Sequence, residues 1–76
     1  MQFFIKEVAV VFVGRRGGYD VYKREDGKYD CRMNYWHEQY NSGPGDVIIW
    51  KDKGKWRGEI MDTDLIEALG AEIDGG

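Results

Sequence analysis

Few side chains of this 76-residue chain could perform catalysis. Cys31 is the only cysteine and His37 the only histidine, and the hydroxyl groups outside the tyrosines belong to Ser42 and Thr63. Covalent catalysis needs a nucleophile beside an oriented base, and a zinc site needs several His, Cys or carboxylate ligands. Cys31 falls on a strand face that we expect to be buried, with no histidine in register. We therefore interpret Cys31 as a small buried hydrophobic residue and expect no enzyme activity, no metal centre and no cofactor.

Carboxylates gather at the C-terminal end. Residues 59–76 hold six acidic residues and no basic one, whereas residues 1–58 hold all eleven Lys and Arg against eight acidic residues. Asp62, Asp64 and Glu67 have helix-capping spacing, which we prefer to a cation site because helix N-termini favour acidic groups. Uncompensated carboxylates favour a surface that binds a basic groove, although a solvated helix face with a frayed end is the alternative. The candidates are Glu59, Asp62, Asp64, Glu67 and Glu72.

Aromatic residues mark two further candidate surfaces. In the segment WHEQY, the partner-binding candidates Trp36, His37 and Tyr40 lie in a stretch without periodicity, although their rings could instead close a small core. A basic and aromatic mixture near residue 53 is of the kind that binds single-stranded nucleic acid. A buried tryptophan pair with solvated lysines is the alternative, and the acidic end disfavours phosphate binding. The candidates of this second surface are Trp50, Lys51, Lys53, Lys55, Trp56 and Arg57.

Short strands must position these residues. Residues 2–13 are apolar at both alternating sets of positions, which predicts a central or bent strand with a bulge at Lys6-Glu7. The segment GRRGG then predicts a turn through left-handed glycines. Residues 19–36 predict a hairpin around Asp26-Gly27, a preferred pair for a two-residue type I′ turn. That register places Tyr22 opposite Cys31, with Tyr29, Cys31, Met33 and Tyr35 on the buried face.

A second hairpin and one helix complete the expected fold. A three-residue loop at 52–54 would place Trp50 opposite Trp56. Residues 62–70 predict a short helix that is capped near Asp62 and stops at Gly70. The expected fold class is mainly β (α+β): about five antiparallel strands in a small SH3- or OB-like barrel or a curved sheet, with one short C-terminal helix. Residues 1–76 are expected to form one domain.

The two ends of the chain resemble those of ubiquitin, which begins with a similar Met-Gln-aromatic strand and ends in Gly-Gly. The resemblance implies a modifier that conjugates through its tail and has a long amphipathic helix after its first hairpin. Residues 19–36 instead alternate with period two, and the residues before Gly75 are acidic where the tail of ubiquitin is basic. We therefore expect strands in this segment and no conjugation.

The leading hypothesis is a non-enzymatic protein-binding module, a phage or mobile-element inhibitor of anti-CRISPR or anti-defence type. Its expected partner is a host nucleic-acid-binding protein with a basic groove. The competing hypothesis is a nucleic-acid-binding β-barrel, although direct nucleic-acid binding is disfavoured. A single cysteine and an apolar run too short to span a membrane predict a soluble protein in the cytoplasm, of the host cell if it is viral.

Overall fold

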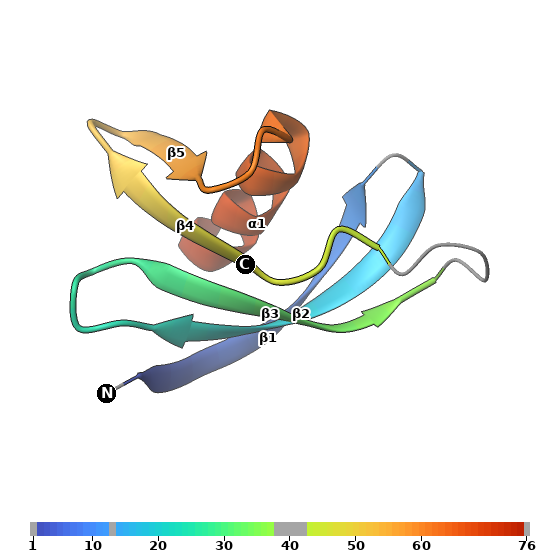
Figure 1. Ribbon diagram of the computed structural model, residues 1–76, viewed down its shortest axis with the longest axis horizontal. Helices are drawn as coiled ribbons and strands as arrows, with labels where there is room; N and C mark the ends of the chain where they lie inside the picture. Colours follow the sequence, from blue (N-terminus) through green and yellow to red (C-terminus); the bar gives the residue numbers. More distant parts are fainter. Residues whose placement is uncertain (1, 13, 38–42, 76) are drawn as a thin grey trace.

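Five strands form one antiparallel sheet and a single helix follows them (Figure 1). The computed structural model describes residues 2–12, 14–37 and 43–75. The sheet order β1-β2-β3-β4-β5 follows the chain, so every strand pairs with its neighbour in sequence. The predicted strands and C-terminal helix are confirmed, and the sheet is open and curved rather than closed into a barrel. The elements are β1 (Phe3–Phe12), β2 (Arg15–Lys23), β3 (Tyr29–Trp36), β4 (Val47–Asp52), β5 (Lys55–Gly58) and α1 (Thr63–Gly75).

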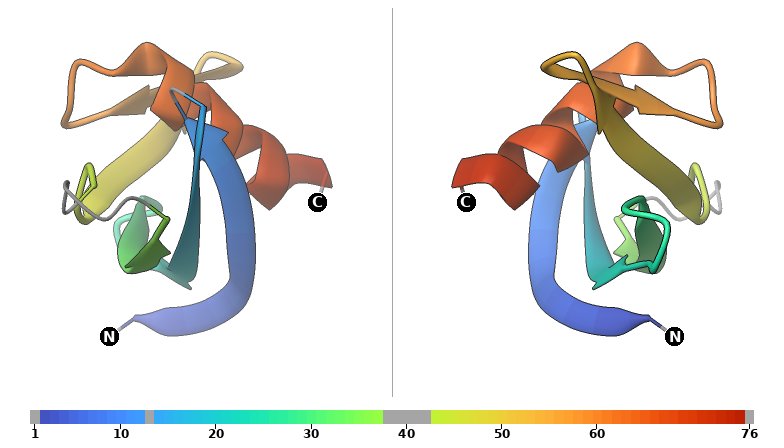
Figure 2. Two further views of the ribbon diagram at one scale, coloured as in Figure 1. Left: turned by 90° about the vertical axis from the view of Figure 1, so that its right-hand side faces the viewer. Right: turned by 90° about the vertical axis from the view of Figure 1, so that its left-hand side faces the viewer.

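Strand β1 bends strongly along its length, and the sheet is curved (Figure 2). A bulge between Phe4 and Lys6 shifts the β1–β2 register next to the predicted position at Lys6-Glu7. Helix α1 contacts both edge strands, β1 and β5, and thus covers one face of the sheet. The core lies between that face and the helix. It consists of Val8, Val10, Tyr19, Val21, Cys31, Val47, Ile49, Leu65, Ile66 and Leu69.

The first hairpin is confirmed, but its loop has three residues rather than two. The amide of Arg24 donates to the Lys28 carbonyl at 2.9 Å, and Gly27 takes the left-handed conformation at φ +88°. A type I turn followed by a left-handed glycine forms such loops. The register therefore differs from the predicted one by one residue, so Val21 lies opposite Cys31 and Tyr22 does not. Burial decides this register, because a one-residue slip would exchange the apolar Val21 with Tyr22 in the core.

The second hairpin has a two-residue loop where three residues were predicted. Lys53 and Gly54 have φ angles of 53° and 81°, as a type I′ turn requires. Lys51 lies opposite Trp56, and Trp50 lies opposite Arg57. The predicted pairing of Trp50 with Trp56 is therefore wrong, and the two rings lie on opposite faces of the sheet. The observed register directs Trp56 toward the core, where it packs against the buried cluster.

Helix α1 continues past its predicted end at Gly70. Gly70 is buried, and a Cβ atom at this position would lie 2.3 Å from Cγ of Trp56. Glycine is therefore required here for close approach of the helix to β5, and not as a helix stop. In the segment GRRGG, only Gly14 has a positive φ, whereas Gly17 and Gly18 continue into β2. Within the described residues, no helix has the length and apolar character needed to cross a membrane.

Candidate functional site

The nucleophile candidate Cys31 is fully buried in the core, as predicted. Burial, with a smaller contribution from the Asp30 carboxylate, raises the pKa of the Cys31 thiol to about 12. The reactive thiolate is therefore scarce near neutral pH. Tyr19, also buried, donates its hydroxyl proton to the Gly45 carbonyl at 3.0 Å. Both side chains are thus part of the core.

The predicted aromatic loop begins inside a strand. Trp36 is the last residue of β3, and its half-buried ring lies 6.3 Å from the Phe12 ring and packs over Gly17. Its buried Nε1 atom has no hydrogen-bond partner among the described residues. His37 is exposed, and its amide donates to the Arg16 carbonyl at 2.7 Å. The third candidate, Tyr40, lies outside the described residues. The contacts of Trp36 with Phe12 and Gly17 close one end of the core.

The predicted acidic residues are distributed over several places. Asp62 and Asp64 are exposed at the beginning of α1. At about 100° per residue, Glu67 and Glu72 fall on opposite flanks of the helix. Glu59 lies off the helix, where its amide donates to the Ile48 carbonyl at 3.1 Å. Among the described residues, no group of three His, Cys, Asp or Glu side chains is arranged to hold a metal ion.

The end of α1 is bound rather than frayed. Asp74 accepts hydrogen bonds from Lys51 Nζ at 2.8 Å and from Trp56 Nε1 at 3.0 Å. The hydrogen bond from Lys51 is the larger cause, and that from Trp56 the smaller, of a pKa of Asp74 below its ordinary value. A hollow of about 450 Å³ lies beside these residues, between the second hairpin and the flank of α1 that carries Glu67.

The basic and aromatic residues of the second hairpin are divided between the two faces of the sheet. Lys51 and Trp56 lie on the helix side, and Trp50 and Arg57 lie on the side away from α1. Lys28, from the first hairpin, places its Nζ 4.5 Å from the centre of the Trp50 ring. Sequence reasoning missed Lys28, because only the alignment of β3 beside β4 brings it to Trp50. Lys53 and Lys55 remain exposed near the hairpin tip.

We call the side of the sheet away from α1 the outer face. The rings of Phe4 and Tyr22 meet edge to face there at 5.5 Å, and the Arg32 guanidinium lies 4.9 Å from the centre of the Tyr22 ring. Phe4 is 57% exposed, and Tyr35, opposite Gly18 on the same face, is 48% exposed. The sequence predictions missed this cluster, because they placed both Tyr22 and Tyr35 on the buried face. The register differs by one residue at Tyr22, and a register shift between Gly18 and Tyr19 turns Tyr35 to the outer face.

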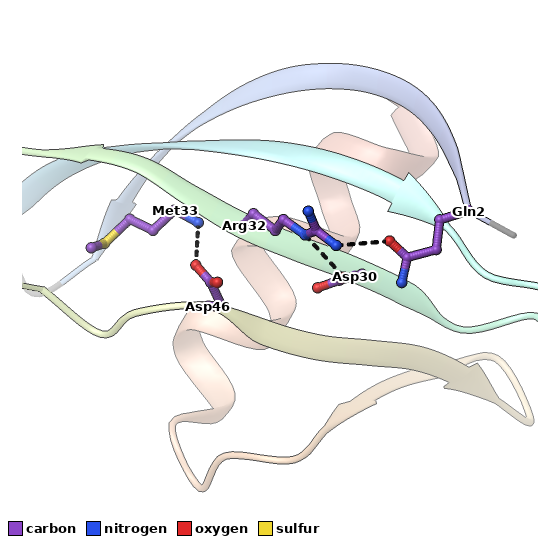
Figure 3. Close-up of polar contacts among 5 residues, drawn as sticks. All are labelled: Gln2, Asp30, Arg32, Met33 and Asp46. Carbon is purple, nitrogen blue, oxygen red and sulfur yellow. Dashed lines mark hydrogen bonds and ion pairs between the residues drawn. The ribbon is translucent and has the colours of Figure 1, made fainter.

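Polar contacts favour one orientation of Arg32 (Figure 3). Its Nε donates to Asp30 Oδ2 at 3.1 Å and its Nη2 donates to Gln2 Oε1 at 3.1 Å. Beside it, Asn34 Nδ2 donates to Glu7 at 2.7 Å and to Asp20 at 3.0 Å. Such exposed contacts add little stability, and they favour one arrangement of these side chains without enforcing it.

The sheet opens between β3 and β4 beside this network. The pairing of the two strands ends at Cys31 and Val47. Further along β3, the Met33 amide donates to the side chain of Asp46 at 2.9 Å instead of to a strand (Figure 3). A hollow of about 260 Å³ lies there, lined by Asp30, Asp46, Val47, Ile48, Glu59 and Ile60. Of its three carboxylates, only that of Glu59 was among the predicted site residues.

No protein-family model matches the chain, and searches of curated proteins and of solved structures found no match. The function must therefore be argued from the geometry of the chain itself. The outer face combines exposed aromatic rings, an oriented arginine and several carboxylates. These groups are all on one face, so a single partner surface could contact them together.

Proposed function

We propose that the chain is a non-enzymatic protein-binding module that contacts its partner through the outer face of the sheet. The observation that carries the proposal is the exposure of Phe4 and Tyr35 on this face, at 57% and 48%. Aromatic residues and arginine supply most of the binding energy at protein interfaces. Burial of apolar surface on this face by a partner favours binding, and the costs of association and of ordering side chains are subtracted from that gain.

The preferred orientation of Arg32 supports the same proposal. A long side chain loses conformational entropy when it is immobilised at an interface, at a cost of about 0.5–1.5 kcal/mol. Asp30, Gln2 and the Tyr22 ring already restrict Arg32 in the free chain. A partner would therefore meet an arginine that loses less freedom on binding. Burial of Cys31, with its raised pKa, favours a binding role over covalent catalysis.

The proposal can be tested with two neighbouring phenylalanines that differ in the face they occupy. Phe4 lies opposite Tyr22 on the outer face, whereas Phe3 lies opposite Lys23 on the other face and is similarly exposed, at 63%. Tagged wild type, Phe4→Ser and Phe3→Ser chains are used for affinity capture from cells. Each protein captured by the wild type is then purified, and its affinity for the three chains is measured by calorimetry.

We expect a partner whose affinity falls about 30-fold or more with Phe4→Ser, as for a residue worth at least 2 kcal/mol in binding, and hardly changes with Phe3→Ser. Partners that respond only to Phe3→Ser would place the binding surface elsewhere and contradict the outer face. If no captured protein distinguishes Phe4→Ser from the wild type, the proposed function fails.

A narrower form of the proposal is that the chain inhibits a host nucleic-acid-binding protein on behalf of a phage or other mobile element, as an anti-defence protein does. Its support is the carboxylates of the outer face, among them Glu7, Asp20 and Glu59, which would occupy a groove that otherwise binds phosphates. Competition between the chain and a nucleic acid for the purified partner tests this form. Simultaneous binding of both would contradict it.

A further inference from the structure

We infer that the partner presents a segment rich in lysine or arginine to the centre of the outer face. This inference rests on the proposed function and specifies the chemistry of the partner. The centre of the outer face consists of two rows of residues across the sheet. The first row is Phe4, Tyr22, Asp30, Ile48 and Glu59, and the second is Glu7, Asp20 and Arg32.

Strand registers align the first row. Tyr22 pairs with Phe4 on one side and with Asp30 on the other, and Asp30 pairs in turn with Ile48. The hydrogen bond from the Glu59 amide to the Ile48 carbonyl continues the row beyond β4. The row thus runs from an exposed aromatic residue on one edge strand to an exposed carboxylate at the other side of the sheet.

The charge of the two rows is strongly negative. Four carboxylates (Glu7, Asp20, Asp30 and Glu59) accompany one guanidinium, that of Arg32, so the formal charge is −4 + 1 = −3. Arg32 is itself paired with Asp30. A phosphate backbone would be repelled by this region, whereas a basic segment would be attracted and would associate faster. The next row of the same face, toward the hairpin tips, is basic: Lys28 lies beside Trp50, and Arg57 lies opposite Trp50.

The hollow between β3 and β4 suits the side chain of such a residue. Ile48 and Ile60 supply apolar walls, and Asp46 and Glu59 supply carboxylates at the same hollow. Lysine and arginine bury an aliphatic stem on apolar surface while their charged end reaches acceptors. A lysine or arginine of the partner would therefore place its stem on the isoleucines and its charge beside Glu59.

The test uses a synthetic peptide of four Arg-Leu-Gly repeats as the probe, with the Glu-Leu-Gly peptide as the charge-reversed control. Amide resonances of the ¹⁵N-labelled chain are followed during titration with each peptide. We expect the arginine peptide to shift resonances of Asp20, Asp30 and Ile48 on the outer face, and the glutamate peptide to leave them in place. Affinity should fall as salt is added, because the attraction is screened.

Two charge-reversal variants decide which carboxylates are responsible. Glu7→Lys with Glu59→Lys should weaken binding of the arginine peptide about tenfold, whereas Glu67→Lys with Glu72→Lys on α1 should leave it nearly unchanged. Because Glu7 accepts a hydrogen bond from Asn34, the single variant Glu59→Lys guards against loss of folding and should show part of the effect. Binding that depends on the α1 pair instead would overturn the inference and assign the contact to the helix.

A titration with single-stranded oligothymidine tests the competing possibility, nucleic-acid binding. Shifts at Lys28, Trp50 and Arg57 with oligothymidine, and none with the arginine peptide, would overturn the inference in favour of nucleic-acid binding. The same charge variants are then measured against any protein captured as above. If partner affinity depends on Phe4 but not on Glu7 and Glu59, the proposed function stands and the basic partner segment is refuted. If partner affinity depends on none of these three residues, the proposed function and the basic partner segment are both refuted.

Discussion

The indole ring of Trp56 packs directly on the α carbon of Gly70, so closely that a Cβ atom there would lie 2.3 Å from Cγ of the ring. The same ring donates its Nε1 proton to Asp74 at 3.0 Å, one turn further along α1. Trp56 therefore joins β5 to the second half of the helix through two different contacts. Together they explain why α1 continues through a glycine that would ordinarily favour its end.

Replacement of Gly70 by alanine should destabilise the fold. Alanine has the higher helix propensity, by about 1 kcal/mol. The overlap with Trp56 should outweigh this gain, because overpacking of a core costs about 1–3 kcal/mol. Gly75→Ala is the matched control, since a Cβ atom at Gly75 would meet no atom within 4 Å apart from its chain neighbours and the backbone of its own helix. Urea denaturation measures both variants, and an unchanged or raised midpoint for Gly70→Ala would contradict the contact.

Lys53→Asn should stabilise the second hairpin. Lys53 is the only described residue other than glycine with a positive φ, and this conformation costs a residue with a normal side chain about 1–2 kcal/mol. Asparagine tolerates it better and would complete an Asn-Gly type I′ turn, so we expect a gain of about 0.5 kcal/mol in thermal or urea unfolding. Glu25→Asn in the first loop should give no gain. Equal gains from both variants would indicate a cause other than the turn.

The Cys31 thiol should be unreactive in the native chain. Thiol reagents such as iodoacetamide should modify it only after unfolding, because the side chain is buried. The pKa of Cys31 is about 12 in the folded chain and about 8.5 in an unfolded one. Only the unfolded state ionises between these values, so the free energy of unfolding should fall as pH rises from about 8.5. Cys31→Ala should reduce this slope, and rapid labelling of the native chain would contradict the burial.

Asp74 should titrate below the ordinary pH range of an aspartate. Lys51 is the first cause of its lowered pKa, so Lys51→Met should raise the pKa toward the usual value, whereas Lys53→Met should not. A lowered pKa stabilises the fold above the ordinary pKa of aspartate, and this contribution is lost as pH falls through the folded-state value. Carboxyl resonances and the Trp56 indole resonance, followed by NMR against pH, measure this. An unshifted midpoint in the wild type would contradict the ion pair.

The two hairpins show which part of the fold the sequence determines locally. Their existence and approximate tips were predictable from Gly27, Gly54 and the alternation around them. Their loop lengths were not predictable: the first loop has three residues where two were predicted, and the second has two where three were predicted. Local turn preference ranks Asp-Gly above Lys-Gly, yet burial of Val21 and Trp56 fixes the register of each strand pair. That burial depends on contacts with α1 and β1, which a local rule does not contain.

The one-residue error in the first hairpin also concealed the outer face. With Tyr22 assigned to the core opposite Cys31, no row linking Phe4, Tyr22 and Asp30 could be recognised. The acidic C-terminal residues were prominent in composition, but composition does not show which flank of a helix each carboxylate occupies. The buried role of Cys31 was predictable, because it depends only on its place in an alternating strand.

Helix α1 contacts both edge strands, and this arrangement has a consequence for the order of folding. The hairpins form from residues that are close in sequence, whereas the contact between α1 and β1 closes a loop of nearly the whole chain. Closure of so long a loop is entropically costly, so this contact should form after the rate-limiting barrier. Leu69→Ala should then mainly accelerate unfolding, whereas Val21→Ala, which also removes contacts between neighbouring strands, should slow folding more than Leu69→Ala does, as stopped-flow kinetics would show. The segment that completes the core would thus govern how long the native state persists rather than how quickly it is reached.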